Sequence, residues 1–205
     1  MSSISIYGPQ KNKIVSENTV SLPSNNYAKN KILFDETIFN YSSNNLKIII
    51  LRPTIVFGTG GQNLKNTLVN FVKENFFKSF IKKSLFYNRN MNLLSVNNLV
   101  ECIVFIINKK FSKNEIFIIS EDDTKENNYL FLYTQLENLL NKKRLLRPIN
   151  IPLKISDWIF RLFKKNNHGL KIIYSNSKLK KIGYKNKFDF RNELKIYILN
   201  QLKRF

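Results

Sequence analysis

Three residues near the start of the chain have side chains that can take part in proton transfer. They are Ser3, Tyr27 and Lys31. Tyr27 and Lys31 are four residues apart, so a helix would place both side chains on one face. A cation beside a tyrosine hydroxyl favours the ionised form, and a serine hydroxyl can orient the same substrate oxygen. The spacing therefore indicates an acid and base site, with a surface Tyr and Lys on an ordinary helix as the alternative.

A strand and a glycine-rich loop follow this candidate site. Residues 45–51 are mostly apolar with several β-branched side chains, and Pro53 follows them, which predicts a buried parallel strand. Residues 116–119 predict a second strand. The glycines in 58–61 would let a loop approach a ligand closely before the next helix begins.

The pattern of apolar and polar residues predicts the remaining elements. Helices are expected at about 26–41, 64–77, 96–109 and 129–141. Between them we expect a loop at 9–26, a basic loop through Lys82, Lys83 and Arg89, and a polar turn at 120–128. Cys102 is the single cysteine and lies in an apolar helix, so we expect a buried free thiol and no disulfide.

Six elements in this order resemble the extended short-chain dehydrogenase/reductases, specifically the NAD-dependent nucleotide-sugar epimerase/dehydratase family. They are the serine motif at Ser3, Tyr27-x-x-x-Lys31, Leu51-Arg52-Pro53, Val96-Asn97-Asn98-Leu99, Phe117-Ile118-Ile119-Ser120 and a C-terminal element from Ser177-Lys178 to Ile182-Gly183. The resemblance spans essentially the whole chain. It is strongest to the branch that acts on UDP-hexoses and UDP-N-acetylhexosamines for surface polysaccharides.

The resemblance implies an α/β fold in two parts. Residues 1–120 would form part of an NAD-binding Rossmann domain, the C-terminal portion of a doubly wound parallel sheet with strands one to four missing. Residues 121–205 would form a small α/β substrate-binding region. The family often dimerises through the helix that carries Tyr27 and the next long helix, so the resemblance also implies a homodimer.

The resemblance further implies the chemistry. NAD, or NADP, would take a hydride from the sugar and return it, giving a 4-epimerase-like reaction on a nucleotide-sugar. Tyr27 would be the acid and base, Lys31 would bind the nicotinamide ribose, and Ser3 would hold the reacting oxygen. Pro53 would lie against the nicotinamide. A 4-keto-sugar reductase and a catalytically inactive chain are the alternatives.

Several positions depart from the family pattern. None of the six glycines lies in the Gly-x-x-Gly-x-x-Gly motif that receives the cofactor pyrophosphate. The chain would thus open inside the fifth strand, and we expect it to be poorly soluble and to bind no NAD when made alone. Ile55 stands where the family has an Asn, and Met91 where it has a UDP-contacting arginine. Asn63 and Arg89 are the remaining substrate-binding candidates.

Composition fits an α/β domain in the cytoplasm. The chain has 43% hydrophobic residues among 205, no run long enough to span a membrane and no signal peptide. Its formal net charge is +20, from 34 basic and 14 acidic residues. The lysines are spread along the chain and no nucleic-acid motif is present, so we attribute the charge to compositional drift and expect no nucleic-acid partner.

One C-terminal segment allows two interpretations. Residues 152–165 predict a basic amphipathic helix with Ile155, Trp158, Ile159 and Leu162 on its apolar face. We expect this face to pack inward; peripheral binding to an anionic membrane is the alternative. His168 has no partner at metal-ligand spacing, so no metal site is predicted.

Overall fold

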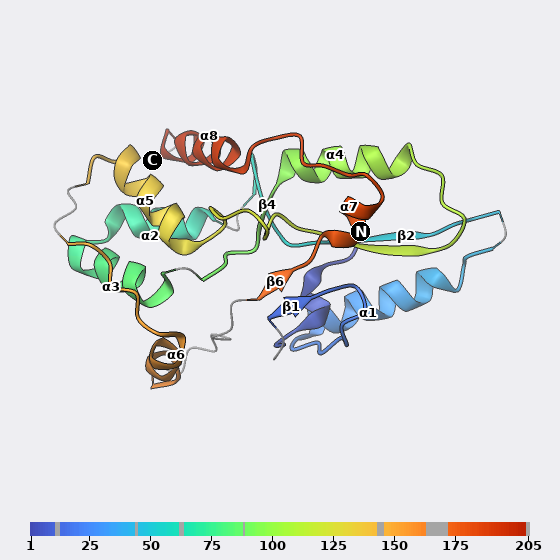
Figure 1. Cartoon of the computed structure of the whole chain (residues 1–205), viewed down its shortest axis with the longest axis horizontal. Coiled ribbons are helices and arrows are strands. Elements are labelled where there is room, and N and C mark those ends of the chain that lie inside the picture. Colours follow the sequence, from blue (N-terminus) through green and yellow to red (C-terminus); the bar gives the residue numbers. More distant parts are fainter. Residues whose placement is uncertain are drawn as a thin grey trace.

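Two parallel strands run through one half of the molecule (Figure 1). The computed structural model describes residues 1–10, 13–43, 45–61, 64–87, 89–142, 146–162 and 172–203. β2 (Ile49–Pro53) and β5 (Glu115–Ile119) pair in parallel, with Ile49 opposite Glu115 and Pro53 opposite Ile119. Both predicted strands are thus confirmed. On the other edge of β2, the backbone N–H of Ser2 donates to the carbonyl oxygen of Leu51 at 2.8 Å.

Two shorter pairs of parallel strands continue the architecture. After β2 the chain turns away from β5 at Thr54 and forms β3 (Ile55–Phe57). This strand pairs with β4 (Leu93–Ser95). β1 (Ile14–Val15) lies inside what was expected to be a loop at 9–26, and it pairs with β6 (Ile173–Tyr174). Every described pair of strands is parallel, as the α/β expectation requires.

Helices cover both faces of the β2–β5 pair. The 3₁₀ helix η1 (Ile4–Tyr7) and α1 (Asn26–Phe39) lie on one side, and α4 (Val96–Ile107) with α7 (Ser177–Lys181) lies on the other (Figure 1). Because side chains alternate along a strand, Ile118 packs with η1 while its neighbours in β5 face α4. Cys102 is buried on the α4 side, as predicted. These elements form what we term the sheet half.

A second core joins four helices at the other end of the long axis (Figure 1). They are α2 (Lys65–Lys73), α3 (Phe76–Phe86), α5 (Tyr129–Leu139) and α8 (Phe190–Leu202), which we term the helical half. The ring of Phe57 enters this core from β3 and meets Phe190 and Tyr197 edge-on, with ring centroids 5.8 Å apart in each pair. The strand pair β3–β4 is therefore where the two halves meet.

Polar side chains fix where most of the longer helices begin. An Asn, Ser or Asp precedes each of five helices, and its side chain accepts a hydrogen bond from a backbone N–H of the first turn. These caps are Asn25, Ser95, Asn75, Asn128 and Asp189. The predicted helices at 26–41, 96–109 and 129–141 are confirmed with slightly earlier ends.

Two predictions for the middle of the chain are wrong. The helix expected at 64–77 ends at Lys73, because Glu74 is extended and Asn75 caps a new helix. That new helix, α3, contains Lys82 and Lys83, which had been placed in a basic loop. Lys83 lies in the helix because its ammonium group is buried against Glu137 of α5.

The acidic and polar turn expected at 120–128 is present, and part of it lies in the interior of the protein. Glu121 and Asp122 are both buried in it. Their carboxylate oxygens accept hydrogen bonds from backbone N–H groups of Ser95 and Tyr174, respectively, which compensates in part for the loss of water. The turn therefore ties the start of α4 and the strand β6 to the end of β5.

The helix α6 (Leu153–Leu162) lies at the lower edge of the view (Figure 1) and contacts the rest of the molecule through the buried Ser156. Within the part of the chain that the structure describes, no helix is both long enough and apolar enough to cross a membrane.

Candidate functional site

The structure brings Tyr27 and Lys31 together on α1. The ammonium nitrogen of Lys31 lies over the Tyr27 ring, 5.6 Å from its centroid, and also 5.8 Å from the ring of Phe34. The same nitrogen is 3.4 Å from the backbone carbonyl oxygen of Met1. Tyr27 is 57% exposed, so its hydroxyl can be reached from solvent. The predicted pair is thus adjacent and accessible.

The pair lies towards the carboxyl end of β2. α1 runs antiparallel to β2, so that its first turn lies near the end of the strand (Figure 1). Asp35 is level with Arg52 of β2, and Tyr27 precedes Asp35 by two helical turns, or about 12 Å of helix axis. In open α/β sheets ligands bind beyond the carboxyl ends of the strands. Tyr27 is therefore placed where such a sheet binds its ligand.

Ser3 lies at the same end but is engaged locally. Ser2 pairs with Leu51, so Ser3 follows one residue further on. The Ser3 hydroxyl oxygen caps η1 by accepting a hydrogen bond from the Ser5 backbone N–H at 3.1 Å. The described hydrogen bonds of Ser3 therefore join it to its own helix cap and not to Tyr27.

A buried polar network holds α1 on the strand beneath this site. The guanidinium of Arg52 donates to one carboxylate oxygen of Asp35 at 2.9 and 3.2 Å. The hydroxyl of Ser2 donates to that oxygen at 3.0 Å. Arg52 also donates to the Tyr7 hydroxyl at 2.9 Å, which joins η1 to the same cluster. Arg52 and Asp35 thus connect α1, β2, η1 and the segment at Ser2 near the candidate site.

Burial shifts the pKa of the Tyr7 hydroxyl more than the charge of Arg52 does. Burial raises the pKa of the Tyr7 hydroxyl, although Arg52 beside it acts in the opposite direction. Tyr7 therefore stays protonated and serves as a structural partner of Arg52. The sequence contained a signal for this network, because Asp35 follows Tyr27 and Lys31 at the same spacing of four residues and so shares their helical face. Its partner Arg52 is distant in sequence, so the pairing itself could not be predicted.

The other predicted site residues are less exposed or undescribed. Pro53 ends β2 and is buried. Arg89 is also buried, and its guanidinium donates to the Ser156 hydroxyl of α6 at 2.7 Å. Asn63 and His168 lie outside the described residues. The assignments of Pro53, Asn63 and Arg89 to cofactor and substrate stay predictions.

The residues present fit only one end of a dinucleotide cofactor. Tyr27 and Lys31 lie towards the carboxyl end of β2, which ends at Pro53, and these three residues are the ones predicted to hold the nicotinamide end. The glycine-rich loop at 58–61 follows β3 and does not provide a phosphate-binding turn of the family's spacing. Gly58 is instead required for packing, since a Cβ there would lie 2.2 Å from a methyl carbon of Val96.

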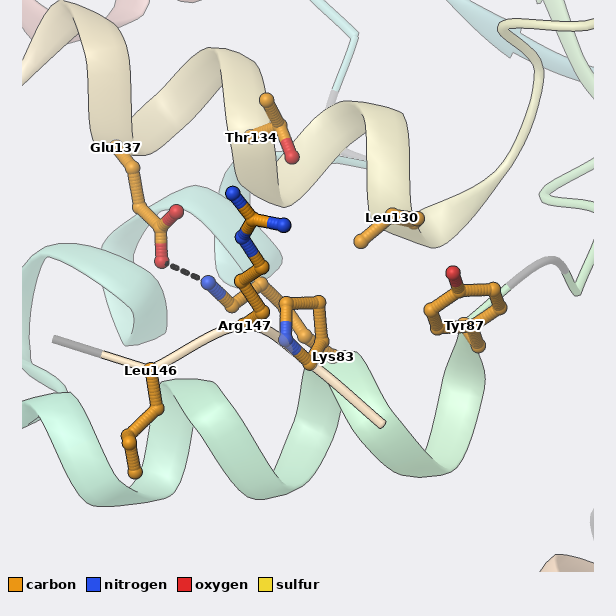
Figure 2. A pocket seen from close by; sticks show the side chains of 8 residues that line it. Lys83, Tyr87, Leu130, Thr134, Glu137, Leu146 and Arg147 are labelled. Atoms are coloured by element: carbon orange, nitrogen blue, oxygen red, sulfur yellow. Dashed lines mark hydrogen bonds and ion pairs between the residues drawn. The ribbon is translucent and has the colours of Figure 1, made fainter. Parts of the chain in front are cut away.

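A cavity of about 550 Å³ lies in the helical half, away from α1. Its walls come from α3, α5 and residues 146–148 (Figure 2). Lys83 and Glu137 form a buried ion pair with a nitrogen–oxygen distance of 2.5 Å. The guanidinium of Arg147 points towards α5 near Thr134, and Tyr87 lies at the end of α3 (Figure 2). The cavity combines apolar walls with a guanidinium and two hydroxyl groups, a set that can bind a small polar molecule.

Comparison with known proteins identifies the family. A model of the NAD dependent epimerase/dehydratase family matches residues 1–120, more than half of the chain. The chain belongs to this family. The region matched contains Ser3, Tyr27 and Lys31, and the family inferred from the motifs is confirmed. None of the curated proteins matches the sequence.

Solved structures support the same fold for this epimerase/dehydratase family member. UDP-glucuronic acid 4-epimerase from Bacillus cereus, in complex with NAD, has a TM-score of 0.64 at 19% identity, over 99% of this chain and 60% of that one. UDP-N-acetylglucosamine 4-epimerase from Methanobrevibacter ruminantium has a TM-score of 0.64 at 16% identity, over 100% and 62%. dTDP-glucose 4,6-dehydratase from Bacillus anthracis, in complex with NAD, has a TM-score of 0.61 at 16% identity, over 99% and 60%.

These likenesses show the fold, because the identities are low. They also show that the chain spans about three fifths of the length of these relatives. The expected α/β fold with parallel strands is confirmed.

Proposed function

We propose that the protein acts in the conversion of a nucleotide-sugar, as a 4-epimerase-like enzyme that uses Ser3, Tyr27 and Lys31. The observation that carries the proposal is the contact between Lys31 and the ring of Tyr27 at the carboxyl end of β2. Membership of the NAD dependent epimerase/dehydratase family supports it. Several of the similar solved structures are epimerases of UDP-sugars.

Each of the three side chains has a role in this proposal. The Tyr27 hydroxyl exchanges a proton with the reacting oxygen of the sugar, which its exposure permits. Lys31, whose ammonium nitrogen lies 5.6 Å from the centroid of the Tyr27 ring, would bind the ribose of the nicotinamide beside the phenol. Ser3 hydrogen-bonds the sugar oxygen and holds it in line with Tyr27, after releasing its cap contact with Ser5.

NAD, when bound, supplies the hydride acceptor and donor for such a reaction. In this chain Tyr27, Lys31 and Pro53 would hold its nicotinamide end. NADP is the alternative cofactor. The buried Asp35–Arg52 pair keeps α1 on β2 and thereby holds the tyrosine and lysine beyond the strand end.

The substrate class rests on the family branch. We propose a UDP-hexose or UDP-N-acetylhexosamine, with a product destined for a surface polysaccharide. Asn63 and Arg89 are its proposed contacts, within the substrate-binding parts of the chain. Arg89 donates to the Ser156 hydroxyl and would reach the substrate with another of its guanidinium N–H groups. A 4-keto-sugar reductase would use the same three catalytic residues.

The direct test is product analysis with the purified chain, NAD and a panel of UDP-sugars. Inversion at C4, detected by proton NMR of the sugar, would support the 4-epimerase and would overturn the expectation that the chain made alone binds no NAD. Replacement Tyr27→Phe removes the proton donor and should lower kcat by roughly 10²- to 10⁴-fold. Tyr41→Phe is the matched control, because Tyr41 is also an exposed tyrosine but follows the end of α1.

The outcomes separate the alternatives. Oxidation of reduced cofactor with a 4-keto-sugar, without inversion of UDP-sugars, would assign the reductase. Turnover of no sugar with either cofactor would contradict the proposal and favour the catalytically inactive chain. Equal loss of activity in Tyr27→Phe and Tyr41→Phe would remove Tyr27 from the mechanism.

A further inference from the structure

We propose that the outward face of α6 binds an anionic phospholipid surface and so holds the protein at a membrane. The proposal goes beyond the sugar chemistry, because it concerns a helix remote from α1 (Figure 1). It also replaces an expectation from the sequence. The apolar face of this helix was expected to pack inward, and the structure contradicts that for Ile155 and Trp158, whereas Ile159 is partly buried.

Those two members lie on the surface of the molecule. Trp158 is 62% exposed and Ile155 is 51% exposed, although both are large apolar side chains. They are three residues apart and so share one face of the helix. Leu146 and Ile149, which precede α6, are exposed as well. Within residues 146–158, four large apolar side chains are therefore presented to solvent.

Contacts on the opposite side prevent the helix from turning this face inward. The Ser156 hydroxyl is fully buried and accepts a hydrogen bond from the guanidinium of Arg89 at 2.7 Å. Just before α6, the backbone N–H of Ile149 donates to the hydroxyl of Ser84 in α3 at 3.0 Å. Rotation of α6 that buried Trp158 would withdraw Ser156 from Arg89. The exposed face is thus fixed by the fold.

The charge around α6 selects an anionic partner. Residues 142–165 contain eight basic residues and a single acidic one, Asp157. Among those that the structure describes, Arg147 and Lys154 are exposed. A helix with Trp on its apolar side and Lys or Arg beside it lies in the headgroup region of anionic bilayers. Basic residues near such a surface each contribute to binding, and this attraction weakens with salt.

The pattern favours a bilayer over other occupants. A tryptophan combines an apolar ring with an N–H group and is enriched at the membrane interface. The described residues contain no helix able to span a bilayer, so the proposed association is peripheral. A self-association face would repel its own copy here, since the same basic residues would meet across a two-fold axis.

The intact chain reports on its own binding. Trp158 is the only tryptophan, so its fluorescence can be followed directly when vesicles are added. We expect the emission to shift to shorter wavelength with phosphatidylcholine vesicles that contain phosphatidylserine, and no shift with phosphatidylcholine alone. Raising the salt concentration should reverse the shift.

Flotation with the same vesicles tests the assignment to α6. Trp158→Glu should weaken binding by about tenfold or more, because it places a carboxylate in the inserted face. Ile155→Glu should also weaken binding, so that the conclusion does not depend on a single variant. Lys154→Glu should weaken binding to anionic vesicles by roughly fivefold or more. Ile107→Glu is the control, since Ile107 is 75% exposed on α4 in the sheet half and should float like the unchanged chain.

Three results would overturn the proposal. One is an equal loss of flotation in Ile107→Glu and Trp158→Glu. The second is a shift in Trp158 emission that follows protein concentration without lipid, which would assign the face to a second copy. The third is no flotation with anionic vesicles at low salt while a DNA duplex binds, which would assign the basic segment to nucleic acid. Circular dichroism of each variant shows that loss of binding is not loss of fold.

Discussion

Among the described residues, each half of the molecule contains a buried ion pair, and the two pairs have different consequences. In the sheet half, Asp35 and Arg52 join α1 to β2 two helical turns from the exposed Tyr27. In the helical half, Lys83 and Glu137 join α3 to α5 beside a cavity. Replacing a buried pair by apolar residues is often neutral, whereas removing one partner is strongly destabilising. The presence of a buried ion pair therefore says more about which elements it holds in place than about how much stability it adds.

The largest expected effect comes from breaking each pair on one side. Asp35→Ala leaves the Arg52 guanidinium buried without its carboxylate partner. Lys83→Met leaves the Glu137 carboxylate buried without its ammonium partner. Each change should lower the free energy of unfolding by about 3–5 kcal/mol, measured by urea denaturation. Only Asp35→Ala should also reduce turnover of a UDP-sugar, because only that pair holds the helix that carries Tyr27 and Lys31.

A double replacement separates burial from charge in the helical half. Lys83→Met combined with Glu137→Leu should recover most of the stability that Lys83→Met loses. A double variant as unstable as the single one would mean that Lys83 and Glu137 also bind other groups that matter. Equal losses of turnover in Asp35→Ala and Lys83→Met would show that the two ion pairs support the candidate site to the same extent.

A smaller effect is expected from pH at the junction of the halves. Burial raises the pKa of Glu121 to about 7, although hydrogen bonds from the Ser95 N–H and the Asn98 amide oppose the shift. Burial likewise raises the pKa of Asp122 to about 6. The folded state therefore binds these protons more tightly than the unfolded chain. The stability from Glu121 is complete below about pH 4.5, the unfolded value, and is lost as the pH rises through about 7.

Thermal melts between pH 5 and pH 8 measure this contribution. Glu121 alone should account for a loss on the order of 3 kcal/mol across that interval. Glu121→Gln keeps the shape of the side chain but does not titrate, so its melting temperature should fall less with rising pH. Parallel curves for the variant and the unchanged chain would show that Glu121 is ionised in the folded state throughout.

The smallest effect concerns packing of the loop after β3. Gly58→Ala should cost about 1–3 kcal/mol, because its new methyl group would overlap Val96 at the start of α4. Val96→Ala in the same chain should restore part of the loss by making room. If Gly58→Ala is as stable as the unchanged chain, the loop can move away from α4 without penalty.

Local signals predicted much of the fold, and contacts distant in sequence explain the errors. Apolar runs and capping residues such as Asn25 and Ser95 are read within a few positions, so most helices and both central strands were placed correctly. Asn75 is also a good cap, but the helix predicted at 64–77 runs past it. Lys83 lies in a helix because its ammonium group forms a buried ion pair with Glu137, 54 residues later in the sequence.

The candidate site divides in the same way. The pairing of Tyr27 with Lys31 follows from a spacing of four residues and could be predicted. Its support by Asp35 and Arg52 depends on a contact between helix and strand, which spacing alone does not encode. The exposure of Trp158 could not be predicted either, since periodicity defines an apolar face without showing what covers it.

The helix α8 has a consequence for how the protein is made. Its buried residues Phe190, Leu194, Tyr197 and Ile198 complete the core of the helical half, and Leu179 of α7 belongs to the core of the sheet half. A ribosome adds about 5–20 residues per second, so roughly 4–16 s pass between the synthesis of Ile119 at the end of β5 and that of Ile198. Until Leu179 is made, β2 and β5 lack part of their cover on the α7 side. The nascent chain is therefore expected to depend on chaperones until these C-terminal helices have left the ribosome.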